Sequence, residues 1–174
     1  EWRLSMKHGT GTYLHADGSK YIGQWVDDSQ SGDGTEEWSD GAKYMGQYEA
    51  GRKNGTGRYT WSNGSTFNGQ FIDNDIHGTG VYSWHDGCSY DGQWIAQQMD
   101  GRGRFAYGDG RTYEGEYSVN LKHGVGTFKW PDGREYEGEW QDGEKHGIGT
   151  WTENGQRRTC TWEKGARAGS AHAE

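Results

Sequence analysis

The sequence predicts an all-β protein: an elongated, single-layer antiparallel meander of 23-residue β-hairpin repeats that stack as a solenoid-like rod. Three observations predict this fold. The same pattern returns every 23 residues along the chain, each unit contains two stretches in which aromatic or glycine residues alternate with polar ones, and Asp-Gly or Asn-Gly pairs recur at the same interval. Alternation with a period of two indicates strands, and no segment has helical periodicity.

The repeat is defined by columns of aromatic residues and glycines. Tyr113-Glu-Gly-Glu-Tyr117 is followed 23 residues later by Tyr136-Glu-Gly-Glu-Trp140, and paired glycines follow each such segment. A further pair of aromatics comes after the paired glycines, and a turn glycine closes the unit. Nearly every aromatic residue falls in one of these columns. Their regular positions therefore indicate a repeated structure and are not a by-product of a high aromatic content. The predicted aromatic lattice includes Tyr113, Tyr117, Phe128, Trp130, Tyr136 and Trp140.

The composition limits the kind of core. Only 29% of the 174 residues are hydrophobic, which excludes a thick aliphatic core, whereas ten Trp and eleven Tyr can each bury a large area. The 32 glycines leave gaps beside the rings, into which we expect an aromatic of a neighbouring strand to lie. Each hairpin is too small to fold alone and buries its rings against its neighbours.

The expected hairpin has about eight residues between its two strands and an Asp-Gly or Asn-Gly turn at the other end, because glycine accepts a positive φ there. Two strands at ~4.8 Å each give ~10 Å per repeat, so seven repeats would form a rod of ~70 Å.

The whole chain, 1–174, is interpreted as a single repeat array. A partial repeat covers 1–20, full repeats begin at residues 21, 44, 67, 90, 113 and 136, a degenerate terminal repeat covers about 155–169, and a tail covers 170–174. Trp2 falls in the column of Trp25, so we infer a piece of a longer array or a trimmed chain. In the terminal repeat Gly155 comes one residue early and Cys160 takes the place of a glycine.

Charge and cysteine content bear on location and partners. The net charge of −8 disfavours nucleic acid as a partner, and two cysteines are too few for a disulfide framework. We therefore expect a reducing, cytoplasmic location. No stretch approaches the ~18 apolar residues of a transmembrane helix.

The pattern Tyr-x-Gly-x-Trp, His-Gly-x-Gly and Asp-Gly resembles the MORN (membrane occupation and recognition nexus) repeat, as in Tyr136 to Trp140 with His146-Gly-Ile-Gly149. The resemblance covers almost the whole chain. It implies an array like those of cytoskeletal MORN scaffolds, some of them homodimeric, associated with the cytoskeleton or with membranes. Departures from the pattern make individual repeats distinguishable to a partner: Ser31, Asn54 and Asp100 replace the usual histidine, and Glu36 replaces an aromatic.

Candidate chemical groups are few. The histidines of one column, including His77 and His146, are interpreted as loop hydrogen-bonding groups, and no nucleophile, base and orienting group converge as a triad would require. His85 and Cys88, three residues apart at a turn, would supply half of a zinc site that a second chain completes; the alternative is two surface turn residues. Apart from this zinc, we expect no cofactor, and we expect no enzymatic activity.

Two candidate partner surfaces emerge. Ile76, Met99 and Leu121 place apolar residues in three consecutive inter-strand loops, which would form a strip for a partner or serve local packing. The second surface is the basic terminal segment, a candidate for homodimerisation or for an acidic phospholipid, with solubility as the alternative. It comprises Arg157, Arg158, Cys160, Trp162, Lys164 and Arg167.

The sequence therefore predicts a non-enzymatic scaffold. It would homodimerise and organise cytoskeletal or membrane-associated proteins in the cytoplasm. Two alternatives stay open: a module that binds phosphoinositides or other acidic lipids, and a regulatory segment of a larger enzyme.

Overall fold

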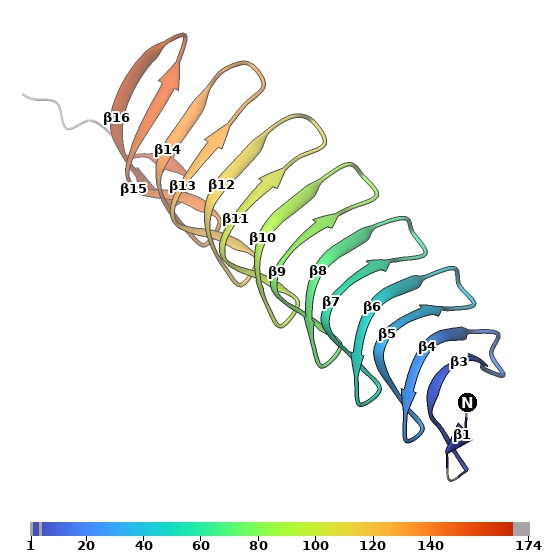
Figure 1. Ribbon diagram of the computed structural model, residues 1–174. Helices are drawn as coiled ribbons and strands as arrows, with labels where there is room; N and C mark the ends of the chain where they lie inside the picture. The colour runs from blue at the N-terminus through green and yellow to red at the C-terminus, as the bar shows by residue number, and fades with distance from the viewer. Residues whose placement is uncertain (1, 4, 169–174) are drawn as a thin grey trace, which may run out of the picture. The chain divides into compact units, whose positions relative to one another are not determined.

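The computed structural model describes residues 2–3 and 5–168, and no helix occurs among them. Strands β1 and β2 form a separate two-stranded sheet, and strands β3 to β17 form a sheet of 15 strands whose spatial order is their order in the sequence. The predicted all-β antiparallel meander of hairpin repeats is confirmed (Figure 1). Residue 169 of the predicted terminal repeat and the predicted tail 170–174 lie outside the described residues.

The strands are β1 (Trp2–Arg3), β2 (Met6–Lys7), β3 (Gly9–Leu14), β4 (Lys20–Val26), β5 (Ser29–Glu37), β6 (Lys43–Glu49), β7 (Arg52–Thr60), β8 (Thr66–Ile72), β9 (Asp75–Ser83), β10 (Ser89–Ile95), β11 (Gln98–Ala106), β12 (Thr112–Ser118), β13 (Leu121–Lys129), β14 (Glu135–Gln141), β15 (Glu144–Glu153), β16 (Gln156–Glu163) and β17 (Ala166–Arg167).

Contacts divide the chain into two compact units. Unit 1 contains residues 1–85 and 95–97, and unit 2 contains residues 86–94 and 98–174. Unit 1 thus includes β3 to β9, and unit 2 includes most of β10 and all of β11 to β17. Within the described residues of either unit, no helix has the length and apolar character needed to cross a membrane.

The core of unit 1 is built from tyrosine rings, with Phe67 in one repeat, that lie on paired glycines. Gly23 of β4 stands opposite Gly34 of β5, and the ring of Tyr21 covers both. A Cβ atom on either glycine would overlap this ring. The Tyr21 side chain is 0% exposed, and its hydroxyl donates a hydrogen bond of 3.0 Å to the backbone oxygen of Gln24. The expected ring from a neighbouring strand is thus found at Gly34, whereas the ring over Gly23 comes from the glycine's own strand.

Unit 2 repeats this arrangement. The ring of Tyr113 covers Gly115 and Gly126, which face each other across β12 and β13. The Tyr113 ring meets Tyr117 at 5.2 Å and 89°, and it meets Trp140 of the next repeat at 5.2 Å and 83°. Edge-to-face pairs of this kind contribute ~0.5–1.5 kcal/mol each beyond their burial. Each tyrosine thus joins its own repeat to the next one.

The eight-residue loop expected between the strands is wrong, because the strands continue to a two-residue turn. In unit 1, Asp73 and Asn74 have φ values of 49° and 77°, the left-handed pair that a tight type I′ hairpin turn requires. The intervening residues belong to β9 and include a β-bulge at Gly78, whose φ is 68°. The Gln70 side chain stabilises this bulge, because its Oε1 accepts a hydrogen bond of 2.8 Å from the backbone N–H of Thr79.

In unit 2 the same acceptor changes from an amide to a carboxylate. Oε1 of Gln93 accepts from the N–H of Arg102 at 2.6 Å, whereas Oε1 of Glu139 accepts from the N–H of Ile148 at 3.2 Å. Glu139 thereby holds the backbone of the bulge in its own repeat.

We expect Gly126→Ala to destabilise the protein by about 1–3 kcal/mol or more, because a buried Cβ would force the Tyr113 ring from its place. Urea denaturation measures the change. Thr127→Ser, on the opposite face of the same strand, is the matched control and should stay within ~0.5 kcal/mol. Equal stabilities of the two variants would contradict the role given to Gly126 beneath the Tyr113 ring.

The buried tyrosines also predict a loss of stability in alkali. Burial, the largest cause in each case, raises the pKa of Tyr21, Tyr44, Tyr90 and Tyr136 to about 12. The unfolded chain ionises these phenols near pH ~10, so the stability they contribute is full below pH ~10 and is lost as the pH rises toward 12. Absorbance at 295 nm should show these phenols still protonated at pH 11 in folded protein. Full ionisation at pH 11 with a native circular dichroism spectrum would contradict this prediction.

Candidate functional site

Unit 2 carries a row of half-buried aromatic rings on the same face as its tyrosine core. The rings follow one another in contact: Tyr107 lies 5.8 Å from Phe128, Phe128 lies 4.4 Å from Trp130, and Trp130 lies 5.1 Å from Trp151. Phe128 is buried, whereas Tyr107, Trp130 and Trp151 each keep part of their ring exposed. These three rings offer a wide apolar contact surface that the rest of the unit leaves partly uncovered.

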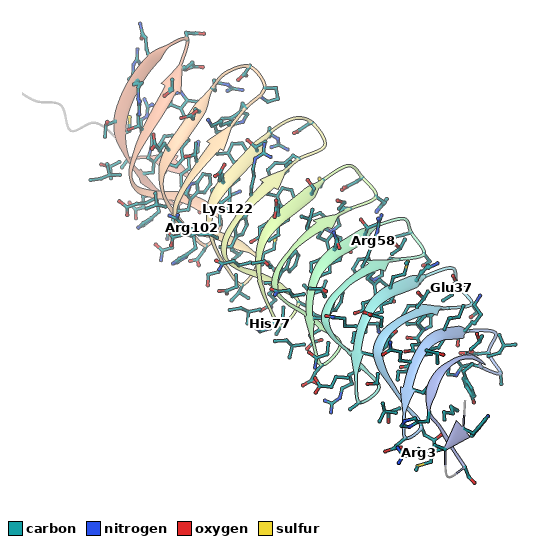
Figure 2. The ribbon with its side chains drawn as sticks, viewed as in Figure 1. Arg3, Glu37, Arg58, His77, Arg102 and Lys122 are labelled. Atoms are coloured by element: carbon teal, nitrogen blue, oxygen red, sulfur yellow. The ribbon has the colours of Figure 1, made fainter. Side chains whose placement is uncertain are left out.

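Two lysines lie on this face among the rings (Lys122 is labelled in Figure 2). Lys122 stands opposite Tyr117, and its Nζ is 4.9 Å from the ring centre of Trp140. Lys145 stands opposite Trp140, and its Nζ is 4.5 Å from the ring centres of both Trp151 and Trp162. Among residues 2–3 and 5–168, no carboxylate forms an ion pair with either ammonium group.

The charges on this face repel one another. Burial lowers the pKa of Lys122, and the neighbouring Arg111 lowers it further. Burial likewise lowers the pKa of Lys145, with additional repulsion from Arg134, Arg167 and Lys122. A nearby positive charge disfavours the charged form of a lysine, so an anion placed here would relieve the repulsion.

Two arginines extend the positive charge beside the rings. The guanidinium of Arg111 lies 4.8 Å from the ring centre of Tyr107, and that of Arg134 lies 5.6 Å from that of Trp130. Each also pairs with an aspartate two residues before it, at 2.7 Å for Asp109 and 2.8 Å for Asp132. These two cations are therefore partly neutralised, in contrast to the lysines.

The face ends in a small hollow of about 260 Å³, lined by Trp151, Glu153, Asn154, Gln156, Arg158 and Arg167. Arg158 stands opposite Trp151, at the place where Tyr136 stands opposite Phe128 in the preceding repeat. A terminal repeat without the tyrosine ring no longer needs a glycine beneath it, which explains Cys160 opposite Gly149. We call the surface formed by Tyr107, Arg111, Lys122, Trp130, Arg134, Lys145, Trp151, Arg158 and Arg167 the basic-aromatic face.

Unit 1 has a related but differently charged face. Lys53 lies 5.0 Å from the ring centre of Trp38 and 5.7 Å from that of Tyr59. Burial lowers the pKa of Lys53, but the nearby Glu36 opposes this change. Glu36 also accepts a hydrogen bond of 2.9 Å from the Tyr48 hydroxyl, which accounts for a carboxylate at an aromatic position. The lysine of unit 1 therefore already has a negative neighbour.

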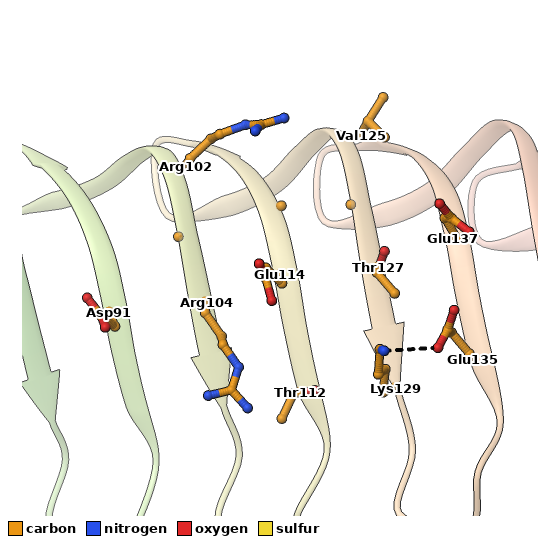
Figure 3. Close-up of a pocket in the computed structure, with 13 residues that line it drawn as sticks. Asp91, Arg102, Arg104, Thr112, Glu114, Val125, Thr127, Lys129, Glu135 and Glu137 are labelled. Carbon is orange, nitrogen blue, oxygen red and sulfur yellow. Dashed lines mark ion pairs between the residues drawn. The ribbon is translucent and has the colours of Figure 1, made fainter.

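A larger hollow of about 820 Å³ lies on the opposite face of unit 2 (Figure 3). Its charges balance locally: Arg104 stands opposite Glu114, and Lys129 pairs with Glu135 at 3.2 Å. Because both signs alternate across it, this hollow favours no charged ligand.

The exposed apolar strip predicted at Ile76, Met99 and Leu121 is wrong. Ile76 of unit 1 is only 7% exposed and stands opposite Phe71, so it is part of the core. In unit 2, Met99 is half-buried and Leu121 is 48% exposed. Side chains alternate along a strand, so Leu121 lies on the face opposite to that of Lys122. These residues serve different surfaces, and a partner role for Met99 or Leu121 stays a prediction.

The basic terminal residues are divided between the two faces of unit 2. Trp162 is 9% exposed and belongs to the core beneath Lys145, so it is unavailable as the surface contact expected of it. Arg157 pairs with Glu137 at 3.3 Å on the other face. Cys160 is half-buried, and Lys164 is exposed in the turn before β17. Their part in dimerisation stays a prediction.

The predicted zinc site needs a second chain. The backbone N–H of Cys88 donates to Asp86 at 3.0 Å, and His85 is exposed. Within the part of the chain that the structure describes, no three His, Cys, Asp or Glu side chains are grouped to hold a metal ion. His85 and Cys88 therefore remain a prediction for an interface between chains.

Sequence reasoning named Arg158 and Arg167 but missed the other cations of the basic-aromatic face, which are Arg111, Lys122, Arg134 and Lys145. A signal was present, because the column of Lys122 and Lys145 also contains Ile76 and Met99, and the column of Arg111 and Arg134 contains small residues in earlier repeats. The loop expected between the strands included Lys122 and Lys145, so their places opposite Tyr117 and Trp140 were not foreseen.

Comparison with known proteins agrees with this architecture. The MORN repeat family matches residues 1–20, 21–43, 44–66, 67–89, 90–110, 113–133 and 136–157. A search of curated proteins found no match. Among solved structures, the chain is similar to the TCP domain of SAS-4 (dCPAP) of Drosophila melanogaster, solved in complex with a proline-rich motif of Ana2 (dSTIL). The TM-score is 0.50 and the identity 14%, over 88% of this chain and 90% of that chain. At this identity the likeness concerns the fold alone. The family match extends over seven repeats, and the chain belongs to the MORN-repeat family.

Proposed function

We propose that this chain is a non-enzymatic interaction scaffold whose basic-aromatic face holds an extended segment of a partner protein. One observation carries the proposal: the half-buried rings of Tyr107, Trp130 and Trp151 follow one another beside lysines that have no ion-pair partner among the described residues. Rings with open faces and unpaired cations are what grooves for extended peptides present. Membership in a repeat family, where function resides on surfaces that the array displays, supports this reading.

The similar fold of the SAS-4 TCP domain adds support of a general kind. That domain was solved with a proline-rich motif bound, so a sheet of this type accommodates a protein segment. Proline-rich segments pack well on aromatic rings, because their polyproline II conformation is preformed and little conformational entropy is lost on binding.

We also propose that the chain forms a homodimer through its last strands. β17 pairs only with Trp162 and Glu163 of β16, so residues 156–160 of β16 have no strand on that side within the described residues. An unpaired edge of this kind is a template for a second copy. The wider setting, a cytoplasmic assembly associated with the cytoskeleton or with membranes, is proposed from the family resemblance.

A random peptide library tests the partner-binding proposal. We expect the full chain to enrich extended peptides that Trp130→Ala and Trp151→Ala variants no longer bind, since each substitution removes an apolar contact surface. Thr127→Ala, on the opposite face, is the matched control and should bind as the parent does. Failure to enrich any peptide would refute the assignment of this face. Peptides that bind both tryptophan variants as tightly as the parent would refute it as well.

Light scattering at micromolar concentration tests the homodimer. We expect twice the mass of one chain, and a lower dimer fraction in Arg158→Glu, because reversing this charge beside the β16 edge disfavours its pairing. Lys20→Glu in unit 1 is the charge-matched control. A mass of one chain over the whole concentration range would rule out the dimer.

A further inference from the structure

We propose that the segment bound by the basic-aromatic face is acidic: an extended stretch of a partner protein with a carboxylate at every third residue and apolar residues between. This inference rests on the proposed function, since it names the chemistry of the partner for the same surface.

The first argument is the charge that this face leaves uncompensated. Lys122 and Lys145 have no carboxylate partner among the described residues, and the Arg158 guanidinium donates a hydrogen bond of 3.1 Å to Oε1 of Gln156, a neutral acceptor. The protein as a whole is acidic, with a net charge of −8, so this concentration of positive charge departs from the rest of the molecule. An anionic partner would replace mutual repulsion with attraction in a partly desolvated setting, where such interactions are stronger than at an exposed surface.

The second argument is spacing. The cations come in one set per repeat: Arg111 with Lys122, Arg134 with Lys145, and Arg158 with Arg167. Successive repeats are two strands apart, or ~10 Å, and an extended chain advances ~3.3 Å per residue. A segment crossing the strands would therefore meet a new set of cations at every third residue. The residues between would lie over the rings of Tyr107, Trp130 and Trp151.

The third argument is the hollow at the end of the face. Arg158 and Arg167 both line it beside Trp151, and the volume of about 260 Å³ would admit a single side chain. Glu153 also lines it, but this carboxylate accepts a hydrogen bond from Nε1 of Trp151 at 3.4 Å. The final carboxylate of the segment would thus meet two guanidinium groups.

Other anions fit this surface less well. Glu153, Asp109 and Asp132 border the cations, and their carboxylates would repel the closely spaced phosphates of a nucleic acid. The ammonium groups of Lys122 and Lys145 lie among aromatic rings and are half-buried, which a flat membrane surface would not reach as readily as a narrow chain.

The test uses a fluorescent nine-residue peptide of three Glu-Pro-Leu units and its twin of three Gln-Pro-Leu units, titrated into the full chain. We expect the Glu peptide to bind at least tenfold more tightly than the Gln twin, and its affinity to fall as salt is added. Lys122→Met and Lys145→Met should each weaken it about five- to tenfold. Methionine is a tolerated replacement, because Met99 occupies the equivalent position in another repeat. Lys53→Met in unit 1 is the matched control and should bind as the parent does, and circular dichroism checks that every variant folds.

Each alternative outcome is distinguishable. If both peptides bind equally and the lysine variants have no effect, the face binds extended chains without regard to charge: the proposed function stands and this inference fails. If the library yields no peptide but phosphatidylserine vesicles bind in a Lys145-dependent way, a membrane is the occupant and both proposals fall. If Lys145→Met lowers the dimer fraction in light scattering and no peptide binds, a second copy occupies the face and the acidic-segment proposal is overturned.

Discussion

The structure depends on the close approach of a tyrosine ring to two facing glycines. In unit 2 the Tyr136 ring lies on Gly138 and Gly149, and its hydroxyl donates to the backbone oxygen of Glu139 at 3.0 Å. This contact sets the spacing of aromatics and glycines along each strand, and the edge-to-face partner on the next hairpin then fixes the repeat to its neighbour. The glycines thus allow each ring to reach the backbone, and the ring in turn buries the backbone that the glycines leave bare. A protein with few aliphatic residues obtains its core in this way.

Much of this fold could be predicted from the sequence, because the contact between a ring and two glycines recurs every 23 residues. The columns of Tyr113 and Gly115 indicate strands, their alternation indicates one buried face, and their period gives a meander of hairpins. The tight turn at Asp73 and Asn74 was missed because neither residue is a glycine, although both adopt a positive φ. The bulge at Gly78 was missed for a related reason: its glycine resembled one more member of the lattice, and the Gln70 side chain that stabilises it lies eight residues earlier.

The candidate site was harder to predict than the fold. Lys122 and Lys145 look like ordinary polar residues of a loop until the register places them opposite Tyr117 and Trp140. A lysine above a ring and a lysine in solvent have the same sequence signature, since only the strand register decides which face it takes. Arg158 was assigned to a basic terminal segment from the sequence, but its position opposite Trp151 emerges only from the structure.

The position occupied by Lys122 has a consequence for how such arrays change. The same place in other repeats is held by Gln30, Lys53, Ile76 or Met99, and the ring on the paired glycines, a tyrosine or Phe67, stays buried in each. Folding therefore places no strict demand on this side chain, although it lies on the aromatic face. When a repeat is duplicated, its tyrosine and glycines must be retained, while this residue is free to diverge. New partner preferences could then arise one repeat at a time, with each substitution altering about 10 Å of surface and leaving the core intact.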